Sequence, residues 1–292
     1  MGARIGRAPI AFPGPGPAGI GPGARLGLPR VAGLETSIGS VGLKIAVCIK
    51  RVPDMELRFA IAADRKSLDQ GGLKYDISDF DGYALEVALQ LVEKQGSGEV
   101  VLVCLGPDGV QETLRKGLAM GAARAIQLKA DAVPVDGLAI AHALAAELGS
   151  GGYDLILFGR MATDTASGTV GPMVAELLDL PCVSSISHLD LAQAQGTARR
   201  DLEGASETVR FPLPALLTID EGIARPRLAT LKGIMAAKKK PLEVKPAALG
   251  EVRLTVESLA LPPERSGPKF VGEGADAVPE LVQRLRTEAK VL

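Results

Sequence analysis

The stretch GRMATDTASGTVGP, from Gly159 to Pro172, has the composition of a loop that could hold a phosphate group. It follows the short apolar run YDLILFG and precedes VGPMVAELLDLP, which has the pattern of a helix. A helix that begins near Gly171 would present free N–H groups and the positive end of its dipole to an anion. Small residues permit close approach to the backbone, and hydroxyls come from Thr163, Thr165, Ser167 and Thr169.

On these residues alone, a nucleotide site and an ordinary strand-to-helix turn both stay open, and Asp164 could contact a ribose or cap the turn. The loop is not GxGxxG and lacks the GK[ST] of a P-loop, so ATP hydrolysis is not expected. No GxSxG motif, diagnostic carboxylate pair or activated nucleophile appears in the sequence. An electron carrier or a binding subunit therefore fits better than a hydrolase or a transferase.

Composition excludes several classes of function. The chain has 292 residues and a net charge of -1, so no broad basic surface attracts nucleic acid or an anionic membrane. No apolar run reaches about 18 residues, so we expect no membrane insertion. His142 and His188 lie far apart, and no cysteine has metal-ligand spacing, so we expect no metal site. Cys48, Cys104 and Cys182 are interpreted as buried, reduced thiols of an intracellular protein.

Strand-like and helix-like segments alternate from residue 43 onward. The runs KIAVCIKRV, EVVLVCLG, YDLILFG and PALLTID are short and apolar, as in parallel strands covered on both faces. Helical patterns occur in DFDGYALEVALQLVEKQG, DGVQETLRKGLAMGA, DGLAIAHALAAELG and VGPMVAELLDLP. The predicted fold class is therefore α/β, a parallel-sheet, Rossmann-like nucleotide-binding domain.

One insertion interrupts this alternation. Leu57 to Ser78 has the pattern of two strands around the polar DRKSLDQGG, which predicts an inserted hairpin. Directly after it, Ser78 is expected to N-cap a helix while Asp81 reaches back, as in a capping box. This loop and the Gly159 loop both follow predicted strands, at the edge where parallel sheets bind ligands.

The two ends of the chain differ from this core. Residues 1–42 contain 17 Gly and Pro, which predicts a disordered tail or a start-site extension, with the native start near Val41 or Leu43. Residues 43–235 form the predicted nucleotide-binding domain. Residues 236–292 are Pro-rich and weakly periodic, so we expect an extended C-terminal arm that lies on a partner subunit, with a floppy tail as the alternative.

From about Leu43 to its end, the chain resembles the beta subunit of electron transfer flavoprotein. KIAVCIKRVPD resembles the family's opening strand and GPDGVQETLRKGLAMGA its second strand-to-helix segment. ARRDLEGASETVRFPLPALLT follows the family signature, and RPRLATLKGIMAAKKKPLE resembles the loop that docks dehydrogenases. The resemblance implies an adenine nucleotide alpha hydrolase-like fold and an electron carrier that is not itself an enzyme. It also implies a heterodimer in which the alpha subunit holds most of the FAD, the beta subunit holds AMP, and the arm packs on the alpha subunit.

Two sets of positions match the family's functional residues. The implied cofactor-binding set is Cys48, Ser78, Asp79, Phe80, Asp81, Leu105, Gly159, Arg160, Met161, Ala162, Thr163, Asp164, Thr165, Ala166, Ser167, Gly168, Thr169 and Val170. The implied docking segment is Arg227, Leu228, Ala229, Thr230, Leu231, Lys232, Gly233, Ile234, Met235 and Ala236. The resemblance implies that Leu231 is the apolar anchor of this segment, that Phe80 and Met55 face the flavin, and that Asp201 lies near the subunit interface.

Some of these positions depart from the family pattern. Ser78-Asp79-Phe80 stands where many relatives have Asn-Pro-Phe, and Ala236 stands where some have Lys. Lys238, Lys239 and Lys240 are either docking charges or a solvated run. Bifurcating relatives bind a second FAD in place of AMP, with a loop like DGDTAQVGP. The DTASGTVGP of this chain shares its Val-Gly-Pro end but not the preceding residues, which favours AMP.

The resemblance implies a shuttle between redox proteins. It would accept electrons from flavin dehydrogenases, such as the acyl-CoA dehydrogenases of fatty acid oxidation, and pass them to a quinone oxidoreductase. Two alternatives stay open: a subunit of a bifurcating flavoprotein that oxidises NADH, and a stand-alone nucleotide-binding sensor domain. A bacterial-type, cytoplasmic chain is expected rather than one of the mitochondrial matrix.

Overall fold

The computed structural model describes residues 42–192, 194–263 and 267–292. These residues form two compact units. The first contains the described residues up to Pro53 together with Tyr75–Leu254, and the second contains Asp54–Lys74 and Thr255–Leu292. The predictions for the N-terminal tail fall on residues 1–41, outside the described part. Along the described ranges, no helix combines the length and the apolar character needed to cross a membrane.

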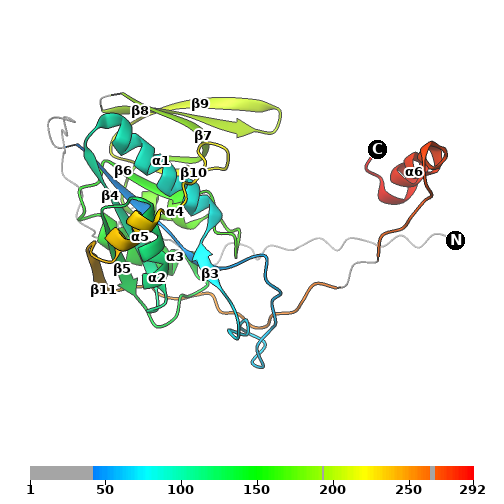
Figure 1. Cartoon of the computed structure of the whole chain (residues 1–292), viewed down its shortest axis with the longest axis horizontal. Coiled ribbons are helices and arrows are strands. Elements are labelled where there is room, and N and C mark those ends of the chain that lie inside the picture. Colours follow the sequence, from blue (N-terminus) through cyan, green and yellow to red (C-terminus); the bar gives the residue numbers. More distant parts are fainter. Residues whose placement is uncertain (1–41, 193, 264–266) are drawn as a thin grey trace, which may run out of the picture. The chain divides into compact units, whose positions relative to one another are not determined.

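The first unit is built on a mixed sheet in which nine described strands follow the order β11-β5-β4-β1-β6-β10-β7-β8-β9 (Figure 1). Pairing is parallel from β11 to β7 and antiparallel from β7 to β9. The strands are β1 (Leu43–Cys48), β4 (Gly98–Gly106), β5 (Arg124–Lys129), β6 (Leu155–Gly159), β7 (Cys182–Ala192), β8 (Gln195–Leu202), β9 (Ala205–Pro212), β10 (Ala215–Ile219) and β11 (Leu242–Pro246).

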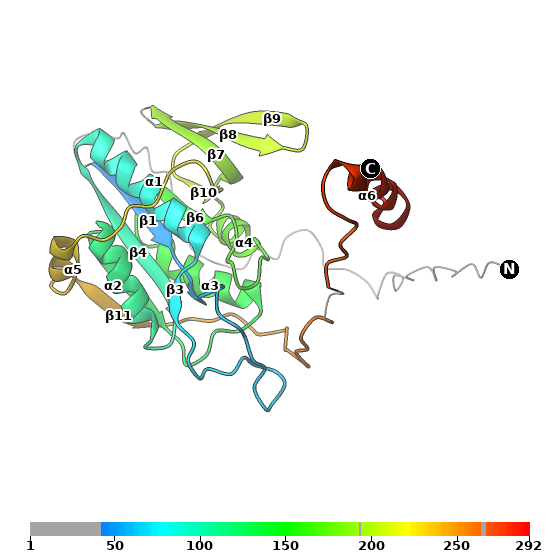
Figure 2. The same cartoon turned by 45° about the vertical axis from the view of Figure 1, so that its right-hand side comes forward.

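Helices cover both faces of the parallel part of the sheet. On one face lie α1 (Asp79–Gln95) and α2 (Val110–Met120) (Figure 2). Their apolar side chains pack against the sheet. On the other face, α3 (Gly137–Leu148) and α4 (Val170–Leu177) do the same. Residues of β6 and β10 are fully buried, because apolar helices lie above and below these strands. The predicted α/β class and all four predicted helices are confirmed.

The chain order creates a switch point between β1 and β6. From β1 the chain proceeds outward to β4 and β5, and it then returns to the other side of β1 to add β6. The loops that follow β1 and β6 therefore leave the sheet side by side at its carboxyl edge. Open α/β sheets bind ligands at this point because the diverging loops leave a crevice there.

Several strands were not anticipated from the sequence. Strands β5, β7, β8, β9 and β11 carry charged or polar residues, and the edge strands β9 and β11 are mostly exposed. The sequence prediction relied on continuous apolar runs, which mark only strands covered on both faces. The family signature at Ala198–Thr218 spans parts of β8, β9 and β10.

The insertion and the arm also differ in detail from the prediction. The insertion is closed at its base by an antiparallel pair, β2 (Arg51–Pro53) and β3 (Tyr75–Ile77), and it contains a single bridge between Ile61 and Leu68. The hairpin exists, but its ladder lies at the base rather than across residues 57–78. The arm expected from residue 236 starts later, because β11 pairs with β5 and the first unit runs to Leu254. The second unit contains α6 (Val278–Arg284) near its end, flanked by the short helices Ala275–Ala277 and Leu285–Ala289.

Candidate nucleotide site and docking segment

A buried carboxylate, Asp81, joins the elements at the switch point. It lies in the first turn of α1, and its Oδ2 accepts a hydrogen bond from the N–H of Lys50, at 2.7 Å. Its Oδ1 accepts one from the N–H of Gly159, the last residue of β6, at 3.0 Å. One side chain therefore fixes the start of α1 against the ends of β1 and β6. The capping box predicted for Asp81 is wrong, because its carboxylate bonds the two strand ends instead of the helix N-cap.

Burial dominates the titration of Asp81. Loss of solvent raises the pKa of this carboxyl from an ordinary 3.8 to about 7, although the hydrogen bonds from Lys50 and Gly159 and the charge of Lys50 oppose the rise. The nearby Asp164 carboxylate adds to the increase. A carboxyl with this pKa holds its proton more tightly in the folded protein than in the unfolded chain.

The stability of the protein should therefore depend on pH through Asp81. Because the pKa is higher in the folded state, protonated Asp81 stabilises the folded protein, and this stabilisation is complete below about pH 4. It is lost as the pH rises to about 7. The change from 3.8 to about 7 corresponds to about 4 kcal/mol. We expect the free energy of unfolding of the wild type, minus that of Asp81→Asn, to fall between pH 4 and pH 7.5. Urea titrations at both pH values measure this difference in free energy of unfolding, and Asp79→Asn, at an exposed position, is the control. A difference independent of pH would contradict the assignment.

Ser78 links the start of α1 to the loop after β6. Its hydroxyl oxygen accepts a hydrogen bond from the N–H of Thr163 at 3.2 Å, and its own N–H donates to the carbonyl of Lys50 at 3.0 Å. Ser78 is the N-cap residue of α1, as predicted, but its side chain makes no capping hydrogen bond to the helix. The hydroxyl is used to position the predicted nucleotide loop instead.

Two ion pairs fix the charged side chains around this loop. Lys50 Nζ lies 2.7 Å from Asp164 Oδ2, which joins the loop after β1 to the loop after β6. Arg160 Nη1 lies 3.0 Å from Asp220 Oδ2, just after β10. Asp164 thus has a role, as an ion-pair partner of Lys50, that neither of the two sequence interpretations included. Lys50 and Asp220 were missed, although both stand in the predicted strand runs, each directly after an isoleucine.

The loop itself has the backbone that close approach of a ligand requires. Ala166 and Gly168 adopt positive φ angles of 51° and 61°, and Gly168 also lies close to the carbonyl of Arg160. Thr169 precedes α4 without a side-chain capping bond, so its hydroxyl and the first N–H groups of the helix can bond an anion. Pro172 stands in this first turn, where its missing N–H costs nothing. These features fit a bound anion such as a phosphate group.

The remaining predicted cofactor-binding residues lie at the same edge of the sheet. Cys48 is the last residue of β1 and Leu105 the last but one of β4, and both are buried on the face that α3 and α4 cover. Burial, followed by the nearby Asp81 charge, raises the pKa of Cys48, so its sulfur remains a thiol and acts as a packing group. Cys104 is also buried, whereas Cys182 is exposed, which corrects the expectation that all three thiols are buried.

Phe80 lies partly exposed beside the loop. Its ring is 6.1 Å from that of Tyr83 in an edge-to-face arrangement, and the Arg160 guanidinium is 5.5 Å from its centroid. Met55, the other residue expected at the flavin, belongs to the second unit. Asp201 lies on β8 with its carboxylate 3.4 Å from Arg199 Nε. Within the residues the structure describes, no cluster of three His, Cys, Asp or Glu could hold a metal ion.

The docking segment (Arg227–Ala236) leads into a short helix and presents apolar side chains to solvent. Helix α5 (Leu231–Ala237) begins after Thr230, whose hydroxyl caps it by accepting the N–H of Gly233 at 3.0 Å. Leu228 is 92% exposed, Leu231 82% and Met235 71%. Three large apolar side chains in one short segment form the kind of patch that marks a protein interface.

Both ends of the docking segment are held by α1 and α2. At its start, Arg227 Nε and Nη2 lie 2.8 and 3.0 Å from the two carboxylate oxygens of Glu86, and Glu93 also pairs with this guanidinium. Glu86 is a buried carboxylate with only 4% of its side chain exposed. Burial alone would raise the pKa of Glu86, but hydrogen bonds from Arg227 and Gln90 outweigh it and lower the pKa. This bidentate pair was missed, although Glu86 interrupts the apolar face of α1.

The chain just beyond the end of the segment is fixed through Lys240 and Arg115. Lys240 Nζ donates to the carbonyls of Leu118 and Ala122 at 2.9 and 2.6 Å, at the end of α2. Arg115 Nη1 donates to the carbonyls of Ala237 and Lys240. Lys240 therefore belongs to neither of the two expected classes, docking charge or solvated run, while Lys238 and Lys239 are exposed.

Comparison with known proteins gives a consistent result. The electron transfer flavoprotein domain matches residues 67–249. The chain is 36% identical over 262 residues to the electron transfer flavoprotein subunit beta of Bacillus subtilis (strain 168), which covers 86% of this chain and all of that protein. It is 35% identical over 256 residues to the protein of the same name from Homo sapiens, covering 85% of this chain and 99% of that protein. A match of this extent, on an α/β fold with its candidate loop at the switch point, shows that the chain belongs to the beta-subunit family of electron transfer flavoproteins.

Proposed function

We propose that the chain is the beta half of a heterodimeric electron carrier that is not itself an enzyme. Its alpha partner would hold most of an FAD, and the pair would accept electrons from flavin dehydrogenases, such as acyl-CoA dehydrogenases, and deliver them to a quinone oxidoreductase. The proposal rests on family membership together with the exposed docking segment, which suits repeated, transient contact with partners. A cytoplasmic location is part of the proposal.

The loop from Gly159 to Val170 is proposed to hold AMP as a structural ligand. The first turn of α4, Thr169 and the positive-φ backbone at Ala166 and Gly168 would bind its phosphate. Lys50, through its ion pair with Asp164, holds this loop against the end of β1. In this proposal these residues only bind and orient the nucleotide, which takes no part in the reaction, because the flavin carries the electrons.

FAD supplies the electron-carrying ring, and the chain's own residues shape one side of its surroundings. Phe80 stands partly exposed at the start of α1, held beside Tyr83 and Arg160, and is proposed to lie against the flavin edge. Asp81 and Ser78 fix that turn to the strand ends, so they set where Phe80 lies. In this role the beta chain positions the flavin and limits its contact with water.

A count of bound nucleotides tests the proposal. The chain is co-expressed with its alpha partner, the heterodimer is denatured, and the released FAD and AMP are quantified by chromatography. We expect one FAD and one AMP per heterodimer, together with flavin reduction by a substrate-loaded acyl-CoA dehydrogenase. A stable monomer that binds no flavin in the presence of the alpha chain would overturn the proposal in favour of a sensor domain.

The bifurcating alternative makes a different prediction for the same sample. It is kept because Val170-Gly171-Pro172 matches the loop of bifurcating relatives. Two FAD per heterodimer, no AMP and consumption of NADH by the purified protein would establish it. Retained AMP without NADH oxidation would exclude it.

A further inference from the structure

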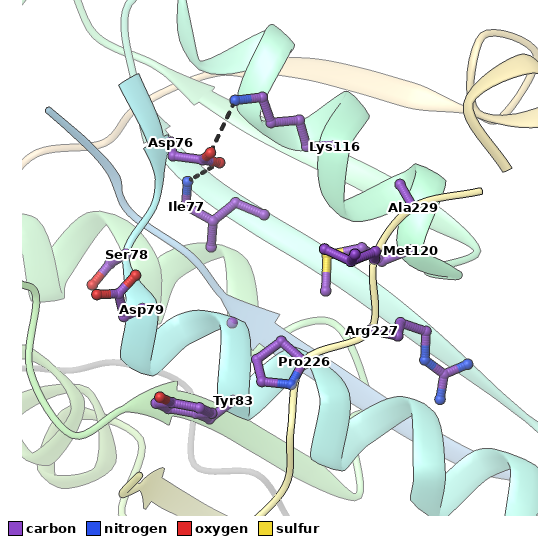
Figure 3. A pocket seen from close by; sticks show the side chains of 12 residues that line it. Asp76, Ile77, Ser78, Asp79, Tyr83, Lys116, Met120, Pro226, Arg227 and Ala229 are labelled. Atoms are coloured by element: carbon purple, nitrogen blue, oxygen red, sulfur yellow. Dashed lines mark hydrogen bonds and ion pairs between the residues drawn. The ribbon is translucent and has the colours of Figure 1, made fainter. Parts of the chain in front are cut away.

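An open groove lies beside the docking segment, on the face of the sheet that α1 and α2 cover. It has a volume of about 510 Å³ and is bordered by the end of β3, the first turns of α1, the last turns of α2 and the chain at Pro226–Ala229 (Figure 3). Its apolar walls include Ile77, Tyr83, Met120, Pro226 and Leu228. None of the predicted docking roles uses the groove itself, although one of its walls is the start of the docking segment.

Most of the charged groups that border the groove already have partners. Lys116 Nζ lies 3.2 Å from Asp76 Oδ2, and the dashed lines in Figure 3 mark the bonds of that carboxylate. Arg227, on the opposite wall, is paired with Glu86 and Glu93. Since these charges neutralise one another, the groove offers little to an ionic ligand. Its surface suits an apolar occupant with a polar rim around it.

The walls of the groove are open to solvent. Of the lining residues, only Ser78 and Gly82 are buried, while the others are exposed or partly exposed. Small-molecule sites usually enclose most of their ligand, which this groove does not do. An open, apolar depression instead fits a side chain that another protein surface presents.

Continuity with the docking segment identifies which protein presents that side chain. Leu228 borders the groove and is 92% exposed, and Leu231, three residues later, is 82% exposed. Exposed apolar side chains therefore occur both at the groove and, three residues later, at the proposed anchor. Because Arg227 is clamped to α1 and Lys240 to α2, the groove wall and the anchor keep fixed positions.

We propose that the groove receives an apolar side chain of the flavin dehydrogenase that docks on this segment. The interface then has two parts: Leu231 inserts into the dehydrogenase, and the dehydrogenase inserts a side chain between α1 and α2. Filled pockets near an interface centre commonly carry much of its binding energy. The inference rests on the proposed function, since it assigns a second contact to the same partner.

The test changes Met120, on the α2 wall, in the complete heterodimer. Met120→Trp fills the groove, and Met120→Gln keeps the side-chain length while making it polar. The electron donor is a purified acyl-CoA dehydrogenase that reduces the wild-type heterodimer, and the measured quantity is the KM for the heterodimer. We expect KM to rise about three- to tenfold in both variants, with flavin content and flavin absorbance unchanged. Glu112→Trp, an exposed position on the same helix outside the groove, should leave KM unchanged.

A parallel measurement on Leu231→Ala separates this inference from the proposed function. If Leu231→Ala raises KM and both Met120 variants stay within twofold of the wild type, the groove assignment is overturned and the docking segment stands. If neither position affects KM, the docking function fails as well. If the Met120 variants alter flavin content or absorbance without changing KM, the occupant is the flavin and not the dehydrogenase. Should Met120→Trp fail to fold, Met120→Gln alone decides.

Discussion

Replacing Leu231 by alanine is expected to lower the kcat/KM of electron transfer from an acyl-CoA dehydrogenase by at least about tenfold. Burying a leucine side chain in a partner contributes about 1.5 to 3 kcal/mol, and 1.4 kcal/mol corresponds to a factor of ten. Leu231 is 82% exposed in this chain, so most of its apolar surface is available to a partner. The effect should fall mainly on KM, because the side chain has no role in the electron transfer step.

The same exposure makes the prediction specific. Since Leu231 packs little against its own chain, alanine at this position should not lower the free energy of unfolding, and it favours the helix slightly. Val244→Ala on the edge strand β11 is the matched control, because Val244 is also an exposed apolar residue but lies outside the docking segment. Stopped-flow measurement of flavin reduction at several heterodimer concentrations separates kcat from KM. An unchanged kcat/KM for Leu231→Ala would refute the anchor role.

The fold could be predicted where a buried strand is a continuous apolar run and not where polar residues interrupt the run. Strands β1, β4, β6 and β10 are continuous apolar runs because helices cover both faces, and this pattern is visible in the sequence. Strand β5 contains Arg124, Gln127 and Lys129, and the buried Gln127 amide donates to the carbonyl of Gly106. A polar residue that is satisfied by a distant backbone group looks exposed in the sequence, so β5 was missed.

The candidate site shows the same limit at the level of single residues. The loop at Gly159 could be recognised because its small and hydroxyl residues are consecutive in the sequence. Helix α4 begins where the helical pattern predicted it. The role of Asp81 could not be predicted, because its hydrogen-bond partners lie 31 and 78 residues away in the chain. Local capping rules predicted a bond to the helix end, and long-range contacts at the switch point replaced it. Sequence spacing alone does not contain this information.

The docking segment was identified by its resemblance to the family. The contacts that hold it in place could not be predicted from the sequence. Its charged anchors, Arg227 and Lys240, resemble ordinary surface cations in the sequence. The partner of Arg227 is the buried Glu86 of α1, and the partners of Lys240 are the carbonyls of Leu118, in the last turn of α2, and Ala122, just beyond that helix. Prediction of such pairs requires the arrangement of the helices on the sheet, which only the folded structure provides.

Substitution of Gly159 by alanine is expected to have the largest effect on the fold and on the nucleotide site together. A Cβ atom at this position would lie 2.5 Å from Asp81 Oδ1, and 2.6 Å from both the backbone nitrogen of Asp81 and the carbonyl carbon of Phe80. Two of these atoms belong to the backbone of α1, so no side-chain rotation relieves the contact. Helix α1 has to move away from β6, which breaks the hydrogen bond from Gly159 to Asp81 and displaces Ser78 from the loop.

The consequence should appear in stability and in bound nucleotide alike. Overpacking and the loss of one buried hydrogen bond together cost about 3 kcal/mol or more, which lowers Tm by roughly 6 to 12 °C in a chain of this size. The AMP that we propose to lie in this loop should fall below half of the wild-type amount per heterodimer, because the loop loses its support. Gly82→Ala is the matched control: its nearest neighbour would be Pro226 Cγ at an ordinary 3.6 Å, and alanine favours a helix interior. A Gly159→Ala protein with wild-type Tm and full AMP would show that α1 and β6 are not held together at this point.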